Sequence, residues 1–197
     1  MQDFSGLILA GGEGRRWGGP KAWAELPDGR SFLRSCFDVL RAAGAKPIVA
    51  TLPPGTDNPG PKGLAEVVLP SSGLDMFASL AAGLCHLVDT LDWSVVAILP
   101  VDHPLVSPRT VTALSEATTT AAIPSFNGKH GHPVCLARSV AESIVDETLT
   151  GPTLREILHL VGAVDVNVED PGVITNCNTP EALTEALKTP RRKSPHT

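Results

Sequence analysis

The chain has 197 residues, of which 42% are hydrophobic, which is enough to bury a core of its own. Its 16 lysines and arginines stand against 21 aspartates and glutamates, so the formal net charge is −5 and no overall basic field indicates nucleic-acid binding. No apolar run reaches the roughly 18 residues of a membrane helix, and the first residues lack the basic and apolar regions of a signal peptide. We therefore expect a cytoplasmic protein that binds neither nucleic acid nor membrane.

Apolar runs alternate with helical periodicity along the chain. Residues 4–10 (FSGLILA) are apolar and end in glycines, which predicts a buried parallel strand. Ser31 and Gly44 bracket an amphipathic pattern that predicts a helix over 31–43. We expect further strands at 46–52, 64–69, 93–99, 119–124, 133–136 and 163–168. We expect further helices at 75–88, 107–118, 138–147, 152–161 and 180–188, with a proline- and glycine-rich loop at 53–63 and a polar loop at 125–132.

This alternation predicts the fold class. Strands followed by helices over the first 120 residues indicate an α/β protein with three α/β/α layers, Rossmann-like, around a mostly parallel sheet. We expect a single domain over residues 1–189 and a disordered basic tail at 190–197. Ligands of such sheets bind beyond the carboxyl ends of the strands, so the loops after 4–10 and 93–99 are the places to examine.

The loop after the first strand, LAGGEGRRWGGPK at residues 9–21, is rich in glycine and positive charge. A dinucleotide fingerprint, G-x-G-x-x-G, fails because Trp17 stands at the third glycine position and the second strand ends without an acid to hold a ribose. A P-loop fails because Pro20 separates Gly19 from Lys21 and no hydroxyl follows the lysine. Both common phosphate-binding patterns are therefore excluded.

A third pattern, G-G-x-G-x-R-x-G-x-x-K, fits the loop at every specified position: Gly11, Gly12, Gly14, Arg16, Gly18 and Lys21. Glycines let backbone N–H groups approach a triphosphate, and a nest of N–H groups suits anions. Arg16 and Lys21 would stabilise the additional negative charge that develops on the α-phosphate when the acceptor attacks. The alternative is a glycine-rich turn with solvated charges.

These residues resemble the signature of the MobA-like and MocA-like nucleotidyltransferases, the molybdenum-cofactor guanylyl- and cytidylyltransferases. The resemblance continues through GLDMFASLAAGL at 73–84, LPVDHPLVSPRTV at 99–111, GHPV at 131–134 and NCNTPEAL at 176–183. It thus spans nearly the whole chain in order. It implies a Mg²⁺-dependent enzyme, with Arg16, Lys21 and Asp102 as catalytic residues. It implies nucleotide binding by Leu9, Ala10, Gly11, Gly12, Gly14, Arg16, Lys21, Ser72, Gly73 and Ser79.

Asp102 follows the apolar run at 93–99, where a sheet delivers side chains to its ligand edge. Mg²⁺ takes one or two carboxylates together with phosphate oxygens, so Asp102 fits a metal ligand, although a helix cap near Ser107 is the alternative. Asn176 and Asn178 would point to one side of an extended segment. We expect Asn178 to contact the metal and both asparagines to face the acceptor, unless Asn178 only caps the following helix.

The remaining polar residues carry alternatives. Ser79 could contact the nucleotide or bond to its own helix backbone. His103, His130 and His132 invite a zinc interpretation, but their spacing is not that of a known zinc site. The GHPV segment resembles the family's acceptor-side loop, which places His132 against the acceptor. Lys129 and Arg155 are equally consistent with an acceptor phosphate and with solvated surface charges.

The resemblance implies transfer of an NMP from an NTP to a phosphorylated acceptor, molybdopterin, with release of pyrophosphate, and hand-over of the product to molybdoenzymes or their chaperones. LAGG resembles the guanylyl group, whereas FASLAAGL and GHPV resemble the cytidylyl group, which favours CTP over GTP. Sugar- or alditol-phosphate acceptors are an alternative. A non-catalytic nucleotide-binding module is another, because two asparagines replace the D-x-D of cytidylyl members and Trp17 stands where the family usually has Met or Leu.

Overall fold

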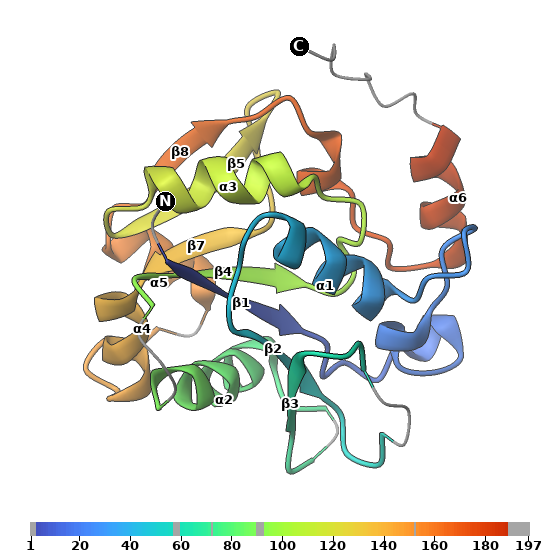
Figure 1. Ribbon diagram of the computed structural model, residues 1–197, viewed down its shortest axis with the longest axis horizontal. Helices are drawn as coiled ribbons and strands as arrows, with labels where there is room; N and C mark the ends of the chain where they lie inside the picture. Colours follow the sequence, from blue (N-terminus) through green and yellow to red (C-terminus); the bar gives the residue numbers. More distant parts are fainter. Residues whose placement is uncertain (1–2, 57–59, 72, 90–92, 152, 189–197) are drawn as a thin grey trace.

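The computed structural model describes residues 3–56, 60–71, 73–89, 93–151 and 153–188, and these residues fold around one eight-stranded sheet (Figure 1). The strand order is β3-β2-β1-β4-β7-β5-β6, with β8 paired to β5. The strands are β1 Phe4–Leu9, β2 Ile48–Leu52, β3 Leu64–Val68, β4 Val95–Pro100, β5 Ala121–Phe126, β6 Lys129–His130, β7 Val134–Ala137 and β8 Val164–Asn167.

Most of the sheet runs in one direction. β1 is parallel to β2 and β4, β2 is parallel to β3, and β5 is parallel to β8. β7 is antiparallel to both β4 and β5, and the short β6 is antiparallel to β5. The expectation of an α/β fold with a mostly parallel sheet is therefore confirmed, with β7 and β6 as the reversed strands.

Helices cover both faces of the sheet (Figure 1). One face carries α1 and α3, and the other carries α2, α4 and α5. Their bounds are α1 Phe32–Ala42, α2 Met76–Val88, α3 Pro108–Ala117, α4 Arg138–Val145, α5 Leu154–Leu160 and α6 Pro180–Lys188. None of the helices in the described ranges is long and apolar enough to cross a membrane.

Two apolar clusters fill the spaces between the sheet and these layers. The first contains Phe32 and Leu40 of α1, both fully buried, and also Leu183 of α6. The second contains Leu84 of α2 and Ile157 of α5, again fully buried. Because alternate residues of each strand point to opposite faces, a continuous apolar run such as β4 supplies both clusters at once.

Side chains at the start of three helices fix where these helices begin. Ser31, Asp75 and Ser107 each precede a helix, and each accepts a hydrogen bond from a backbone N–H of its first turn. Such capping satisfies donors that the helix itself leaves unpaired. Asp75 thereby orients the start of α2 toward the carboxyl edge of β1.

Most boundaries differ from the sequence-based ones by one or two residues, and the differences include the following. β2 begins at Ile48 rather than at residue 46, after a cis peptide bond between Lys46 and Pro47. The expected loop at 125–132 contains a hairpin, with Asn127 and Gly128 at positive φ in its turn, an Asn-Gly hairpin signal that we overlooked. The helices expected at 138–147 and 152–161 are shorter, at 138–145 and 154–160. The expected tail at 190–197 lies outside the described residues, and the domain limit at 189 stays a prediction.

Candidate functional site

The two loops of interest leave neighbouring strands at the same edge of the sheet. β1 ends at Leu9 and β4 ends at Pro100, and these two residues are paired across the parallel ladder. The chain winds from β1 toward β3 on one side and continues through β4 on the other, so the strand order reverses between β1 and β4. Open α/β sheets bind ligands in the crevice at such a reversal.

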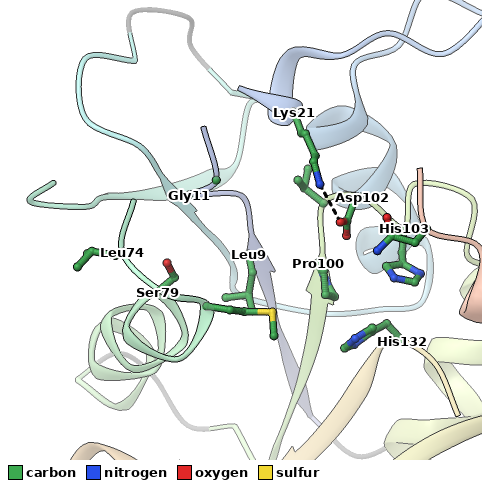
Figure 2. Close-up of a pocket in the computed structure, with 13 residues that line it drawn as sticks. Leu9, Gly11, Lys21, Leu74, Ser79, Pro100, Asp102, His103 and His132 are labelled. Carbon is green, nitrogen blue, oxygen red and sulfur yellow. Dashed lines mark hydrogen bonds and ion pairs between the residues drawn. The ribbon is translucent and has the colours of Figure 1, made fainter. Parts of the chain in front are cut away.

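A cavity of about 340 Å³ opens at this point. Figure 2 shows Leu74 and Ser79 on one side of the cavity and His103 and His132 on the other, with Lys21 and Asp102 next to His103. The full lining is Leu9, Gly11, Gly12, Lys21, Leu74, Met76, Ser79, Pro100, Val101, Asp102, His103, His132 and Asn176.

The glycine-rich loop forms a tight turn in which several backbone N–H groups have no hydrogen-bond acceptor among the described residues. Gly14 has φ +62°, and a Cβ there would lie 2.0 Å from the carbonyl oxygen of Gly19, so only glycine closes the turn. A 3₁₀ turn at Arg15–Trp17 follows. In the described part of the chain, the backbone N–H groups of residues 11–14 have no hydrogen-bond acceptor. Adjacent unpaired N–H groups of this kind form a concavity that suits an anion.

Lys21 links this loop to two other segments. Its ammonium nitrogen Nζ lies 3.1 Å from Asp102 Oδ2, just after β4, and also donates to Asn178 Oδ1, before α6. The Lys21 and Asp102 side chains are 19% and 17% exposed, so this ion pair is much less screened by solvent than one at the surface. A cation therefore already sits between a carboxylate oxygen and an amide oxygen.

The segment before α6 is held against the end of β4. The Cys177 N–H donates a 2.7 Å hydrogen bond to the Asp102 carbonyl oxygen, and the Cys177 carbonyl oxygen accepts a 3.1 Å bond from Trp17 Nε1. Trp17 in turn packs edge-on against Phe32, with ring centroids 5.2 Å apart. These contacts bring Asn176 to the cavity and Asn178 to Lys21.

His103 and His132 form the second wall of the cavity. Their rings meet edge to face with centroids 5.0 Å apart, and His103 Nδ1 lies 3.4 Å from the Gly172 carbonyl oxygen. His132 Nδ1 is buried and has no partner in the described ranges. Burial, with the neighbouring His103, lowers the pKa of His132 to about 4, and burial also lowers the pKa of His103. Both imidazoles are therefore neutral at pH 7, when each can still donate one hydrogen bond and accept one.

The third histidine points elsewhere. His130 Nε2 lies 2.9 Å from Asp165 Oδ1, on β8, and not beside His103 or His132. Among the described residues no group of three or more His, Cys, Asp or Glu side chains could hold a metal ion by itself. The structure therefore gives no support to the zinc interpretation.

The fold and the loop identify a protein family. The MobA-like NTP transferase domain, as described by its family model, matches residues 6–165, which include the glycine-rich loop, the end of β4 and the histidine wall. The chain belongs to this family. It is thus a member of the nucleotidyltransferases, as the sequence signature indicated.

Relatives of known name agree with this assignment. The molybdenum cofactor guanylyltransferase of Rhodobacter capsulatus is 31% identical over 203 residues, covering 98% of this chain and 99% of the relative. The bifunctional enzyme IspD/IspF of Novosphingobium aromaticivorans is 38% identical over 68 residues, which are 34% of this chain but only 17% of that enzyme. Similarity to the first relative extends over the full length, whereas similarity to the second is local.

A solved structure shares the fold. Rv0371c of Mycobacterium tuberculosis H37Rv superposes with a TM-score of 0.80 at 22% identity, covering 96% of this chain and 100% of that one. A structure of Rv0371c in complex with manganese has a TM-score of 0.71 at 19% identity, with the same coverage. These TM-scores show that the chain shares the fold of the Rv0371c structures.

Most site residues expected from the sequence meet at the cavity. Leu9, Gly11, Gly12, Lys21, Ser79, Asp102, His132 and Asn176 line it, and Asn178 adjoins it through Lys21. Ala10 is buried, and its N–H is bonded to the Thr51 carbonyl oxygen. Gly14, Arg16 and Gly73 do not line the cavity, and Arg16 and Gly73 are exposed; Ser72 lies outside the described residues. The catalytic, binding and metal-ligand roles of all these residues stay predictions.

The structure also shows the surroundings of residues whose roles the sequence left open, and it adds two residues to the cavity lining. Ser79 Oγ has no hydrogen-bond partner in the described part of the chain, so its hydroxyl is available to a ligand. Lys129 is exposed on the hairpin, and Arg155 lines a separate surface hollow beside His130. Sequence reasoning missed Leu74 and Met76 as cavity walls. Met76 begins α2 and is 53% exposed, and an apolar residue at the start of a helix on the ligand edge was the available signal.

Proposed function

We propose that the protein catalyses Mg²⁺-dependent transfer of an NMP from an NTP to a phosphorylated acceptor, with release of pyrophosphate. The observation that carries this proposal is the meeting of three elements at one cavity: Gly11 and Gly12 of the glycine-rich loop, whose backbone N–H groups are unpaired in the described part of the chain, the Lys21 ammonium and the Asp102 carboxylate. In phosphoryl chemistry of this kind, catalysis consists of positioning and electrostatic stabilisation, and no protein nucleophile is required.

The glycine-rich loop supports triphosphate binding. Gly11 of this loop and Lys21 lie at the same cavity (Figure 2), and the N–H groups of residues 11–14 are unpaired in the described part of the chain. We expect the triphosphate to draw the Lys21 ammonium away from Asn178, because a polyanion offers it a stronger partner than an amide oxygen. Lys21 would then stabilise the charge on the α-phosphate as the acceptor oxygen attacks in line. Arg16, exposed on the same loop, is the second cation that could reach the phosphates.

The oxygen set around Lys21 Nζ fits a divalent cation. Asp102 Oδ2 and Asn178 Oδ1 already share one cation, the ammonium group. Mg²⁺ accepts such oxygens and takes its remaining ligands from water and phosphate. When bound there, the ion would neutralise charge on the triphosphate oxygens. The manganese complex of Rv0371c supports the use of a divalent metal in this family.

The two walls of the cavity support two substrates. Leu74, Met76 and Ser79 offer an apolar surface and one free hydroxyl, which suit a nucleoside. His132 lies on the other wall (Figure 2), and Asn176 also lines the cavity; both offer neutral hydrogen-bonding groups, which suit the acceptor. We assign the nucleoside to the first wall and the acceptor to the second. This arrangement would place the α-phosphate between them, beside Lys21 and Asp102.

The base and the acceptor are the finer parts of the proposal. FASLAAGL and GHPV favour CTP. GTP is the second candidate, supported by the full-length similarity to a protein named molybdenum cofactor guanylyltransferase. The same name supports molybdopterin as the acceptor, with hand-over of the product to molybdoenzymes or their chaperones. A sugar or alditol phosphate would satisfy the same chemistry.

Pyrophosphate release tests the proposal. The protein is incubated with Mg²⁺ and each of the four NTPs, with and without molybdopterin, and with a sugar phosphate as a second acceptor. We expect acceptor-dependent pyrophosphate with CTP or GTP only. Tight NTP binding without turnover on any acceptor would instead support a non-catalytic nucleotide-binding module. The presence of both Lys21 and Asp102 at the cavity argues against that outcome.

A further inference from the structure

The indole of Trp17 joins the glycine-rich loop to a segment 160 positions later in the chain. Its Nε1–H donates a 3.1 Å hydrogen bond to the Cys177 carbonyl oxygen. The ring is held by Phe32, which is fully buried at the start of α1 and meets the indole at an interplanar angle of 74°. Because Phe32 cannot move without disturbing the core, the direction of the indole N–H is fixed.

Residue 177 is held from both sides. Its carbonyl oxygen is bonded to Trp17, and its N–H is bonded to the Asp102 carbonyl oxygen at 2.7 Å. Residues 175–178 belong to no helix or strand. The two bonds of Cys177 therefore pair its backbone groups and hold the segment in place, as backbone hydrogen bonds do within a helix or a sheet. The neighbours of Cys177 are Asn176, at the cavity, and Asn178, on Lys21.

We propose that Trp17 is a positioning residue that fixes the Asn-Cys-Asn segment relative to Lys21 and Asp102. Trp17 and Lys21 belong to the same loop, so the loop grips this segment at two points: the backbone of residue 177 and the side chain of Asn178. The Trp17 bond does not involve Lys21, so it would keep the two asparagines in place for the acceptor and the metal when a triphosphate draws Lys21 away from Asn178. The effect on turnover rests on the proposed function, whereas the effect on the segment does not.

The buried thiol of Cys177 provides a test that is independent of catalysis. Cys177 is fully buried, whereas Cys85 is exposed and serves as an internal reference. Trp17→Phe keeps an aromatic ring against Phe32 but removes the donor. The matched control is Trp23→Phe, because Trp23 is also half-buried against the same apolar cluster, and its indole has no acceptor in the described part of the chain. Alkylation by N-ethylmaleimide is followed at each cysteine by peptide mass spectrometry.

We expect Trp17→Phe to raise the alkylation rate of Cys177 about five- to tenfold. The variant loses a hydrogen bond that opposes local opening of the segment, so the thiol is exposed more often. Trp23→Phe should change it less than about twofold, and Cys85 should react equally in all proteins. No rise in Trp17→Phe, or an equal rise in Trp23→Phe, would overturn the proposal. Trp17→Met introduces a residue type usual in the family and should raise the alkylation rate of Cys177 as Trp17→Phe does. It replaces Trp17→Phe in the test if that variant folds poorly.

Turnover supplies the second readout. In Trp17→Phe we expect kcat to fall about tenfold while KM for the NTP changes less than about twofold, because the N–H groups of the loop are unchanged. A raised Cys177 rate with unchanged kcat would refute the positioning role. If the wild type itself turns over no NTP, the proposed function fails, but Cys177 alkylation still decides whether Trp17 holds the segment.

Discussion

Lys21 and Asp102 are 81 positions apart in the sequence, yet Lys21 Nζ lies 3.1 Å from Asp102 Oδ2 at the carboxyl edge of the sheet. The lysine arrives on the glycine-rich loop after β1, and the aspartate follows β4, the strand paired to β1. Because the ammonium group also contacts Asn178, it occupies the oxygen cluster where we propose that a metal ion binds with NTP. This relationship makes the lysine and the metal competitors for the same carboxylate.

Removing the ammonium group should therefore have two opposite effects. In Lys21→Met, the affinity for free Mn²⁺ should rise about tenfold, because Asp102 no longer has an internal cation. At the same time kcat should fall about 10²- to 10³-fold, because the transition-state charge loses a partner. Electron paramagnetic resonance of Mn²⁺ and initial rates measure the two quantities. Lys62→Met, on an exposed loop, is the control; equal Mn²⁺ affinity in Lys21→Met and the wild type would contradict the competition.

Asp102→Asn tests the proposed metal ligand with little change in shape. The amide can still accept from Lys21, so the melting temperature should fall by only a few degrees. Turnover should fall about 10³-fold or more at saturating NTP and Mg²⁺, because the only carboxylate among the described residues that line the cavity is lost. Near-normal turnover in this variant would show that Asp102 does not bind the metal. Asp165→Asn, beside His130 and away from the cavity, should retain full activity.

The turn at Gly14 predicts a loop-specific effect of a single methyl group. Gly14→Ala forces a left-handed residue and places a Cβ 2.0 Å from the Gly19 carbonyl oxygen. Gly29→Ala is a matched control, because Gly29 has φ +80° but no atom lies within 4 Å of where its methyl group would stand. Backbone strain should cost each variant about 1 kcal/mol of stability, and Gly14→Ala should lose more because its Cβ also overlaps backbone atoms. Only Gly14→Ala should weaken NTP binding, by about tenfold in calorimetry; equal affinities in the two variants would contradict this.

His132 predicts a pH dependence of stability. Its pKa of about 4 in the folded protein lies below the ordinary value of 6.5, so only the unfolded chain takes up this proton between those values. The contribution of His132 is fully present above pH 6.5 and is lost as the pH falls toward 4, by up to about 3 kcal/mol. Urea denaturation at pH 7, 6 and 5 should therefore show a steeper loss in the wild type than in His132→Gln, which cannot be protonated. Parallel losses would mean that another group is responsible.

Local patterns in the sequence predicted the framework of the site correctly. The apolar runs of β1 and β4 and the loops that follow them indicated where the cavity lies, because a parallel sheet brings the ends of its strands to one edge. The hairpin at 125–130 was missed although its Asn-Gly turn was visible, since the polar residues around it were interpreted as a loop. Arg16 shows the limit of a motif: it fits the signature, but its exposed side chain lies outside the cavity lining.

The sequence by itself determined the fold class, the family signature of the glycine-rich loop and the position of Asp102 after β4, because each depends on neighbouring residues and their periodicity. Only the tertiary structure decided that Lys21 bridges Asp102 and Asn178, that His103 meets His132 edge to face while His130 pairs with Asp165, and that Trp17 bonds to Cys177. These contacts join segments that are far apart in the chain. Periodicity says which face a residue occupies but not which distant residue will meet it, because that choice is made by the packing of the whole fold.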